Sequence, residues 1–164
     1  MIIHVKNKNT LIIDEFKLRC CVGKKGLELN KKEGDLKTPK GLYKLKKLYF
    51  RKDRVEYPAC RISKKIITKN MGWCDDPKSK YYNKLIEFPY KYSAEKLWLK
   101  KNIYDVVIVI NYNLKPVIKN KGSAIFMHIS KKKDSNTKGC IAISKKEIIF
   151  LLTKINKRTK ILIN

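Results

Sequence analysis

Two short, almost continuous apolar runs constrain the fold of this chain more than any other feature of its sequence. The first is YDVVIVIN at 104–111, and the second is SAIFMHI at 123–129. Runs of this length that are rich in Val and Ile are typical of strands buried on both faces of a sheet. We therefore expect both segments to form buried strands, the first of them central in its sheet.

The remaining segments add more strands and few helices. MIIHV and TLIIDEF flank the turn-like KNKN and predict a hairpin, which FKLRCCVG continues. GLYKLKKLYF at 41–50 and TKILIN at 159–164 indicate further strands, whereas the aromatic segment at 71–90 indicates a long irregular loop. Two short helices are expected: one at 93–101 with Ser93 as its N-cap, and one after Ser144, where Glu147 completes a capping box. The pattern predicts a single, mainly β domain with short helices over residues 1–164.

Lysine dominates the charge of the chain. Its 164 residues include 40 Lys or Arg and 14 Asp or Glu, so the formal net charge is +26, and lysine outnumbers arginine 35 to 5. A basic surface can bind nucleic acid through the phosphates, but proteins that read nucleic acid use arginine for bidentate contacts. Because the basic residues are spread along the whole chain, we interpret the charge as compositional bias with a solvated lysine surface. We do not expect nucleic acid as a partner.

The cysteines and the start of the sequence indicate a reduced protein. The five cysteines include no C-x-x-C pair, and with two histidines in the chain we expect no metal site. The start lacks the basic and apolar regions of a signal peptide, and no run approaches the length of a membrane span. We expect a cytoplasmic monomer, or a location in the periplasm or cell wall if a leader precedes this sequence.

One histidine and one cysteine form the main chemical pattern. His128 ends the second apolar run, and Cys140 follows twelve positions later within TKGCIAIS. The intervening loop can bring the two side chains together as a nucleophile and its base, and Gly139 permits a sharp turn beside the sulfur. Lys138 and the lysines at 131–133 would favour a thiolate. The residues alone leave an alternative open, in which Cys140 is a buried core thiol, as free cysteines often are.

Several segments, in the same order, closely resemble the YkuD-type L,D-transpeptidase catalytic domain family. GSAIFMHI and TKGCIAIS are similar to its active-site segment, which has a histidine on one strand and a [ST]-x-G-C signature after a loop. EGDLKTPKGLYKL is similar to the T-P-x-G-x-[FY] segment of the family, and GWCDDPKSKYYNKLI and EKLWLKKNIYDVVIVINYN look like a branch with W-C-D-D-P and Y-N. The resemblance extends from about residue 23 to the end and implies a compact β-sandwich-like domain with short helices.

The resemblance also implies an activity, a bacterial source and no cofactor. Cys140 would attack the bond between the L-centre of diaminopimelate and the terminal D-Ala of a peptidoglycan stem peptide and form a thioester. His128, oriented by the carbonyl of Ile129, would move the proton, and amides near Gly139 would hold the oxyanion. The acyl group would pass to an amine or, as the alternative, to water in an L,D-carboxypeptidase of peptidoglycan recycling. A non-enzymatic basic binder of an anionic polymer is the competing class.

Two positions depart from the pattern of the family. Many members read S-H-G-C where this chain has lysine at 138, and many place Arg or Asn two residues after the cysteine, where this chain has Ala142. A contact with a substrate carboxylate that relatives make from that position would have to come from elsewhere, for example from a lysine.

The middle segment and the loop before Cys140 supply the expected substrate contacts. The expected wall residues are Trp73, Asp75, Asp76, Tyr82, Asn83, Thr137 and Lys138. In the alternative interpretation, Asp75 and Asp76 form a turn with Pro77 and the aromatic residues cover the core. Ser123 lies five positions before His128 and would point to the opposite face of a regular strand.

Overall fold

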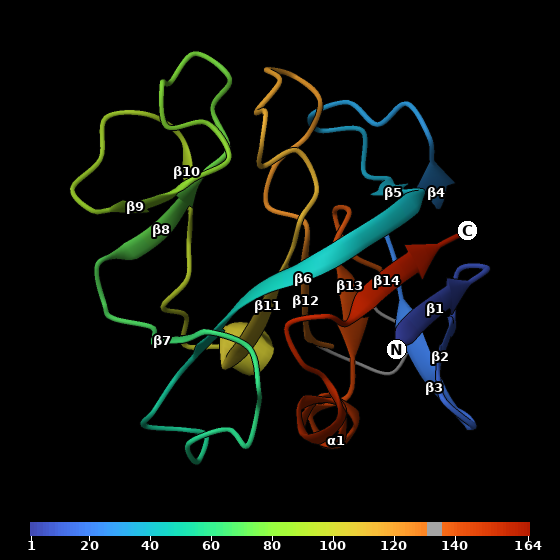
Figure 1. Cartoon of the computed structure of the whole chain (residues 1–164). Coiled ribbons are helices and arrows are strands. Elements are labelled where there is room, and N and C mark those ends of the chain that lie inside the picture. Colours follow the sequence, from blue (N-terminus) through green and yellow to red (C-terminus); the bar gives the residue numbers. More distant parts are fainter. Residues whose placement is uncertain (131–135) are drawn as a thin grey trace.

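The computed structural model describes residues 1–130 and 136–164 and shows a mainly β protein (Figure 1). One large sheet contains β1 (Ile2–Lys6), β2 (Thr10–Ile13), β3 (Phe16–Cys21), β6 (Gly41–Phe50), β7 (Lys64–Ile66), β11 (Val106–Ile110), β12 (Phe126–Ile129), β13 (Ile141–Ile143) and β14 (Lys160–Ile163). Its strand order is β11-β12-β13-β3-β2-β1-β14-β6-β7. The predicted fold class is therefore confirmed.

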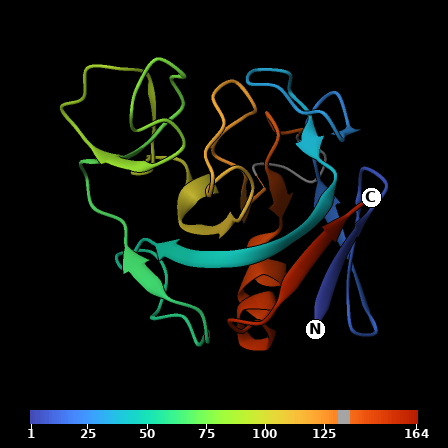
Figure 2. The ribbon, with the colours of Figure 1, turned by 45° about the horizontal axis from the view of Figure 1, so that its top comes forward.

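The long strand β6 closes this sheet into a barrel-like core. Its first part pairs antiparallel with β14, so that Lys44 lies opposite Lys160. Its second part pairs antiparallel with β11, so that Leu48 lies opposite Ile108. Because β11 stands at the far end of the strand order, this second pairing joins the two ends of the sheet (Figure 2).

The apolar runs form β11 and β12, as predicted, and all of their residues are buried. The two strands are antiparallel neighbours, and β12 also pairs in parallel with β13. The predicted N-terminal hairpin is β1 and β2, in which alternation places Ile3 and Val5 in the core. The same alternation leaves the intervening side chains outside the barrel.

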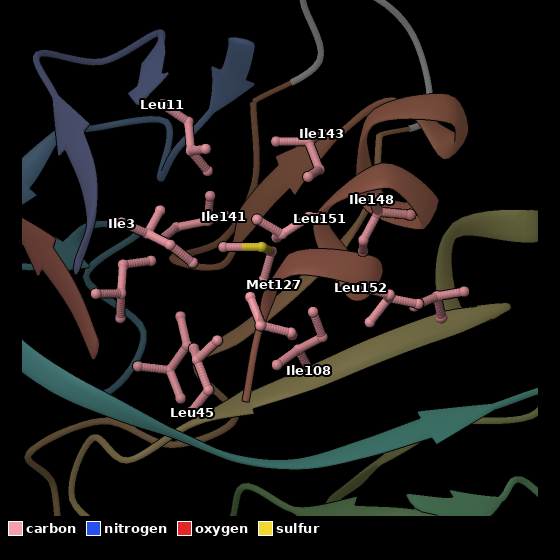
Figure 3. Close-up of a cluster of buried hydrophobic side chains, with 14 of the residues drawn as sticks. Ile3, Leu11, Leu45, Ile108, Met127, Ile141, Ile143, Ile148, Leu151 and Leu152 are labelled. Carbon is pink, nitrogen blue, oxygen red and sulfur yellow. The ribbon is translucent and has the colours of Figure 1, made fainter. Parts of the chain in front are cut away.

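A single helix covers one opening of the barrel. Among the described residues, α1 (Lys145–Lys154) is the only α-helix, and it begins with the predicted capping box of Ser144 and Glu147. Its buried side chains are Ile148, Leu151 and Leu152, and Figure 3 shows them meeting side chains from the strands. In the part of the chain that the structure describes, no helix has the length and apolar character to cross a membrane.

Short elements form the opposite end of the molecule. They are β4 (Leu27–Glu28), β5 (Thr38–Pro39), β8 (Met71–Cys74), β9 (Leu85–Glu87) and β10 (Ala94–Lys96). The 3₁₀ helix η1 (Asn102–Tyr104) instead lies at the start of β11. Strands β4 and β5 pair in parallel, and β10, β8 and β9 form a three-stranded sheet in that order. In Figures 1 and 2 the loop between β4 and β5, the loop between β11 and β12, and the β8–β10 segment gather at this end.

Two secondary-structure predictions are wrong. The segment 93–101 is not a helix: its residues 94–96 form β10, where Glu95 pairs with Trp73 of β8. An isolated helix of this length is only marginally stable, so pairing with an available strand overrides its helix propensity. The segment 71–90 is not an irregular loop throughout, because β8 and β9 pair across it with Gly72 opposite Ile86.

Candidate active site

Cys140 and His128 line one cavity, whose volume is about 550 Å³. The topology explains their proximity. His128 lies on β12, and Cys140 directly precedes β13, its parallel neighbour, in which Ile141 is opposite Met127. Because β12 and β13 run side by side in the same direction, the residue just before β13 lies beside β12. The spacing of twelve residues thus places the two side chains in one site.

The thiol of Cys140 is buried and hydrogen-bonded to the backbone. Its Sγ donates to the carbonyl of Ala124 at 3.1 Å and accepts the N–H of Phe126 at 3.4 Å. The pKa of this thiol is raised to about 12, mainly by burial and also by the charge of Glu95, although the Phe126 N–H and the charge of Lys31 oppose the shift. The thiol of the free protein is therefore neutral at physiological pH.

This neutral thiol contradicts the expectation of a thiolate. The desolvation of a buried group disfavours its charged form, and this effect outweighs the nearby positive charge. Lys138 is exposed, and its charge acts on the partly buried carboxyl of Glu95, where it opposes the rise in pKa that burial causes. The lysines expected to help at 131–133 lie outside the described residues.

His128 is held in one orientation by its own strand. Its Nδ1 lies 2.9 Å from the carbonyl oxygen of Ile129. A carbonyl oxygen only accepts, so Nδ1 carries the hydrogen and Nε2 keeps a free lone pair. Burial lowers the pKa of His128, so the ring is neutral at physiological pH. Among the described residues, no hydrogen bond joins this ring to the thiol of Cys140.

The ring of His128 also packs edge-on against Tyr104, with 5.2 Å between the ring centroids. The hydroxyl of Tyr104 donates to Glu95 Oε1 at 2.7 Å. Burial raises the pKa of Glu95. Tyr104 of η1 thus contacts the imidazole directly, and Glu95 of β10 holds Tyr104 in place.

Gly139 shapes the turn that carries the thiol. Its φ of +141° is unfavourable for residues with a side chain, and a Cβ there would lie 2.8 Å from the carbonyl oxygen of Lys37. The Gly139 N–H donates to Thr137 Oγ1 at 3.1 Å, and the same hydroxyl donates to the carbonyl of Cys140 at 2.6 Å. The Gly139 amide, expected to hold an oxyanion, therefore has a partner within its own turn.

The T-P-x-G segment connects to this turn through Thr38. Its hydroxyl donates to the carbonyl of Gly139 at 2.8 Å and accepts the N–H of Gly23 at 2.8 Å. Thr38 is fully buried. One side chain thus links three segments through hydrogen bonds: the start of β5, the residues that follow β3, and the turn before Cys140.

Of the expected substrate-wall residues, three line the cavity: Asp75, Thr137 and Lys138. Asp75 Oδ1 is buried and has no hydrogen-bond partner among the described residues. The carboxylate of Asp76 instead accepts the N–H of Lys78 in a turn, which matches the alternative interpretation.

The other three expected wall residues, Trp73, Tyr82 and Asn83, lie behind the residues that line the cavity. Trp73 Nε1 donates to Asn83 Oδ1 at 2.9 Å, and the same oxygen accepts the N–H of Ala124 at 3.0 Å. Ala124 in turn accepts the thiol hydrogen of Cys140. Tyr82 donates to Glu33 Oε2. These side chains position the cavity wall and do not line the cavity.

Several residues that line the cavity were not predicted from the sequence, and one residue was expected in a different place. The residues that were not predicted are Lys31, Glu33, Glu95 and Tyr104. The last three lie within the segments that resemble the family, and Lys31 lies just before the first of these segments, but no chemical role was expected for any of the four. Ser123 was expected on the face opposite His128, but it lines the same cavity and donates to Glu33 Oε2 at 2.7 Å. The reason is that β12 begins only at residue 126 and the backbone before it is irregular, with a φ of +50° at residue 124.

Comparison with known proteins agrees with the resemblance seen in the motifs. The family model for YkuD, described as the L,D-transpeptidase catalytic domain, matches residues 2–163. The match therefore includes the N-terminal hairpin as well as the segments that carry the motifs. A search of curated proteins found no match.

Proposed function

Because the chain belongs to the L,D-transpeptidase catalytic domain family, which acts on peptidoglycan stem peptides, we propose that it is a cysteine acyltransferase that forms new amide links between stem peptides. The observation that carries the proposal is the shared cavity of Cys140 and His128, in which Nδ1 is engaged and Nε2 has no hydrogen-bond partner among the described residues. The donor bond lies between the L-centre of diaminopimelate and the terminal D-Ala.

In the first half-reaction the thiol rotates away from the Ala124 carbonyl and gives its proton to Nε2 of His128. The sulfur then attacks the carbonyl carbon of the donor peptide. The tetrahedral intermediate collapses, the carbon–nitrogen bond breaks, and the leaving D-Ala amine takes the proton back from His128. A thioester on Cys140 remains. A neutral thiol and a neutral imidazole are suited to this step, because the imidazole can accept the proton that the thiol loses before the attack.

In the second half-reaction an acceptor amine attacks the thioester. His128 takes the proton of the amine, the carbon–sulfur bond breaks, and Cys140 recovers its hydrogen. Three carboxyl groups support an amine as the acceptor: Glu33, Asp75 and Glu95 line the cavity. These carboxyl groups outnumber the two lysines that also line the cavity, and so they attract a cationic amine. The bound amine loses one proton to solvent before it attacks, and His128 takes the second. Neutral water gains nothing from the charge of the cavity.

Incubation with tetrapeptide muropeptides, followed by mass spectrometry, tests the proposal. Crosslinked dimers are expected from the native protein, and the Cys140→Ala variant should form none. Cys74→Ala is the matched control, since Cys74 is also buried but does not line the cavity. Tripeptide as the sole product would mean that water is the acceptor, as in a carboxypeptidase. Full turnover by Cys140→Ala would refute the mechanism.

A further inference from the structure

The cavity contains a buried lysine that the proposed mechanism does not use. The side chain of Lys31 is 3% exposed, although lysine is almost never fully buried unless it is paired. Its Nζ donates to Asp35 Oδ1 at 2.7 Å and to the carbonyl of Lys32 at 3.1 Å. An ammonium group carries three N–H donors, so one donor of Lys31 has no acceptor among the described residues.

Two glycines fix where this ammonium lies. A Cβ built on Gly122 would lie 2.9 Å from Cε of Lys31, and one built on Gly139 would lie 3.6 Å from the same atom. Gly139 directly precedes Cys140, and the charge of Lys31 acts to lower the pKa of the Cys140 thiol. The end of the Lys31 side chain is therefore beside the nucleophile.

The surrounding groups decide what kind of ligand atom can approach this position. Glu33, Asp75 and Glu95 line the same cavity and repel an anion. The other lysine of the cavity, Lys138, is exposed, so solvent screens its charge more strongly. Among the described residues, Lys31 is the one buried cation that lines the cavity. A negatively charged ligand group is therefore stabilised mainly at Lys31.

We propose that Lys31 binds the terminal carboxylate of the donor stem peptide and so makes the protein select peptides with a free C-terminal D-residue. The inference rests on the proposed function, since the carboxylate in question belongs to the donor. Asp35 holds the ammonium in place, because its carboxylate also accepts the N–H groups of Lys32 and Lys37. The third donor of Lys31 is left for the ligand.

The experiment compares two donor peptides that differ in one group. One ends in D-Ala with a free carboxylate, and the other ends in D-alanine amide. The ratio of their kcat/KM values is measured for the native protein and for Lys31→Met. The native ratio is expected to be about 10 to 100, the range of one charge-assisted hydrogen bond. In Lys31→Met the ratio should fall toward one, mainly through a higher KM for the carboxylate peptide.

Lys37→Met is the matched control. Lys37 forms an ion pair with Glu28 at 2.6 Å in the same region, but it does not line the cavity. Its ratio should equal the native one, and Lys31→Arg should recover part of the selectivity. Because both peptides meet the same population of folded protein, the ratio does not depend on how much of a variant folds.

The outcomes separate this inference from the function on which it rests. Cleavage of both peptides by the native protein with a ratio near one would overturn the role of Lys31. Equal losses for both peptides in Lys31→Met, through kcat, would also overturn it, because Lys31 would then act on the thiol or the oxyanion. If the native protein cleaves neither peptide, the proposed function fails and the inference fails with it.

Discussion

Replacing Thr38 by valine tests whether one buried hydroxyl holds the catalytic turn. Valine has nearly the shape of threonine, so the substitution leaves no large cavity. It removes a donor to the carbonyl of Gly139 and an acceptor from the N–H of Gly23, both at 2.8 Å. Thr38 is fully buried, so water cannot replace the hydroxyl without a change in the structure.

The magnitude follows from the two partners left behind. A buried polar group without a partner costs about 1–3 kcal/mol, so Thr38→Val should lower the free energy of unfolding by about 2–6 kcal/mol. Proteins of this kind are stable by about 5–15 kcal/mol, so the variant should fold but with a small margin. Thr38→Ser keeps the hydroxyl and loses one methyl group, which should cost about 1 kcal/mol.

Urea unfolding of the native protein and the two variants measures the effect. At a slope of about 2 kcal/mol per molar urea, the midpoint for Thr38→Val should fall by about 1–3 M with an unchanged slope. Turnover should also fall by about 100-fold, because a displacement of about 1 Å in a catalytic turn has that effect. Equal midpoints for the valine and serine variants would refute the reasoning.

Three further predictions concern His128, Cys140 and Ser144. Because burial lowers the pKa of His128 from 6.5, the pH profile of kcat/KM should decline only below pH 6.5. The free energy of unfolding should fall as pH drops below about 6.5, where the unfolded chain binds the proton more readily, and His128→Gln should lose that part of the pH dependence. With a pKa of about 12, Cys140 should react with iodoacetamide at pH 8 about 100-fold more slowly than a free thiol, and the rate should rise steeply with pH. Peptide mass mapping measures the rate of labelling, and labelling at the rate of a free thiol would contradict the burial described. Ser144→Ala removes the N-cap of α1 and should lower the free energy of unfolding by about 1 kcal/mol without changing kcat. Urea unfolding measures the stability and a turnover assay measures kcat; an unchanged unfolding midpoint would mean that the cap contributes nothing.

Local sequence patterns were sufficient to predict the elements that are determined by interactions between nearby residues. The capping box at Ser144 and Glu147 was predictable because both of its hydrogen bonds lie within four residues. The buried strands β11 and β12 were predictable because their composition suits no other environment. The common cavity of His128 and Cys140 followed from a short loop between neighbouring strands.

The errors concern features that long-range contacts decide. Residues 94–96 form a strand because β8 offers them a partner, and no local signal distinguishes this from a helix. The burial of Lys31 depends on Gly122 and Gly139, about 90 and 110 positions away. The protonation state of Cys140 depends on how deeply it is buried, and a sequence shows nearby charges but not the desolvation that outweighs them here.

The position of β14 in the sheet has a consequence for how the protein is made. This strand lies between β1 and β6, and it is synthesised about 110 residues after β6 ends. At about 5–20 residues per second, a nascent chain carries the facing edges of β1 and β6 without their partner for about 5 to 20 s. Unpaired strand edges readily pair with other chains. The period of greatest exposure to aggregation therefore falls during translation, and slowing the ribosome after residue 50 should lower the yield of soluble protein.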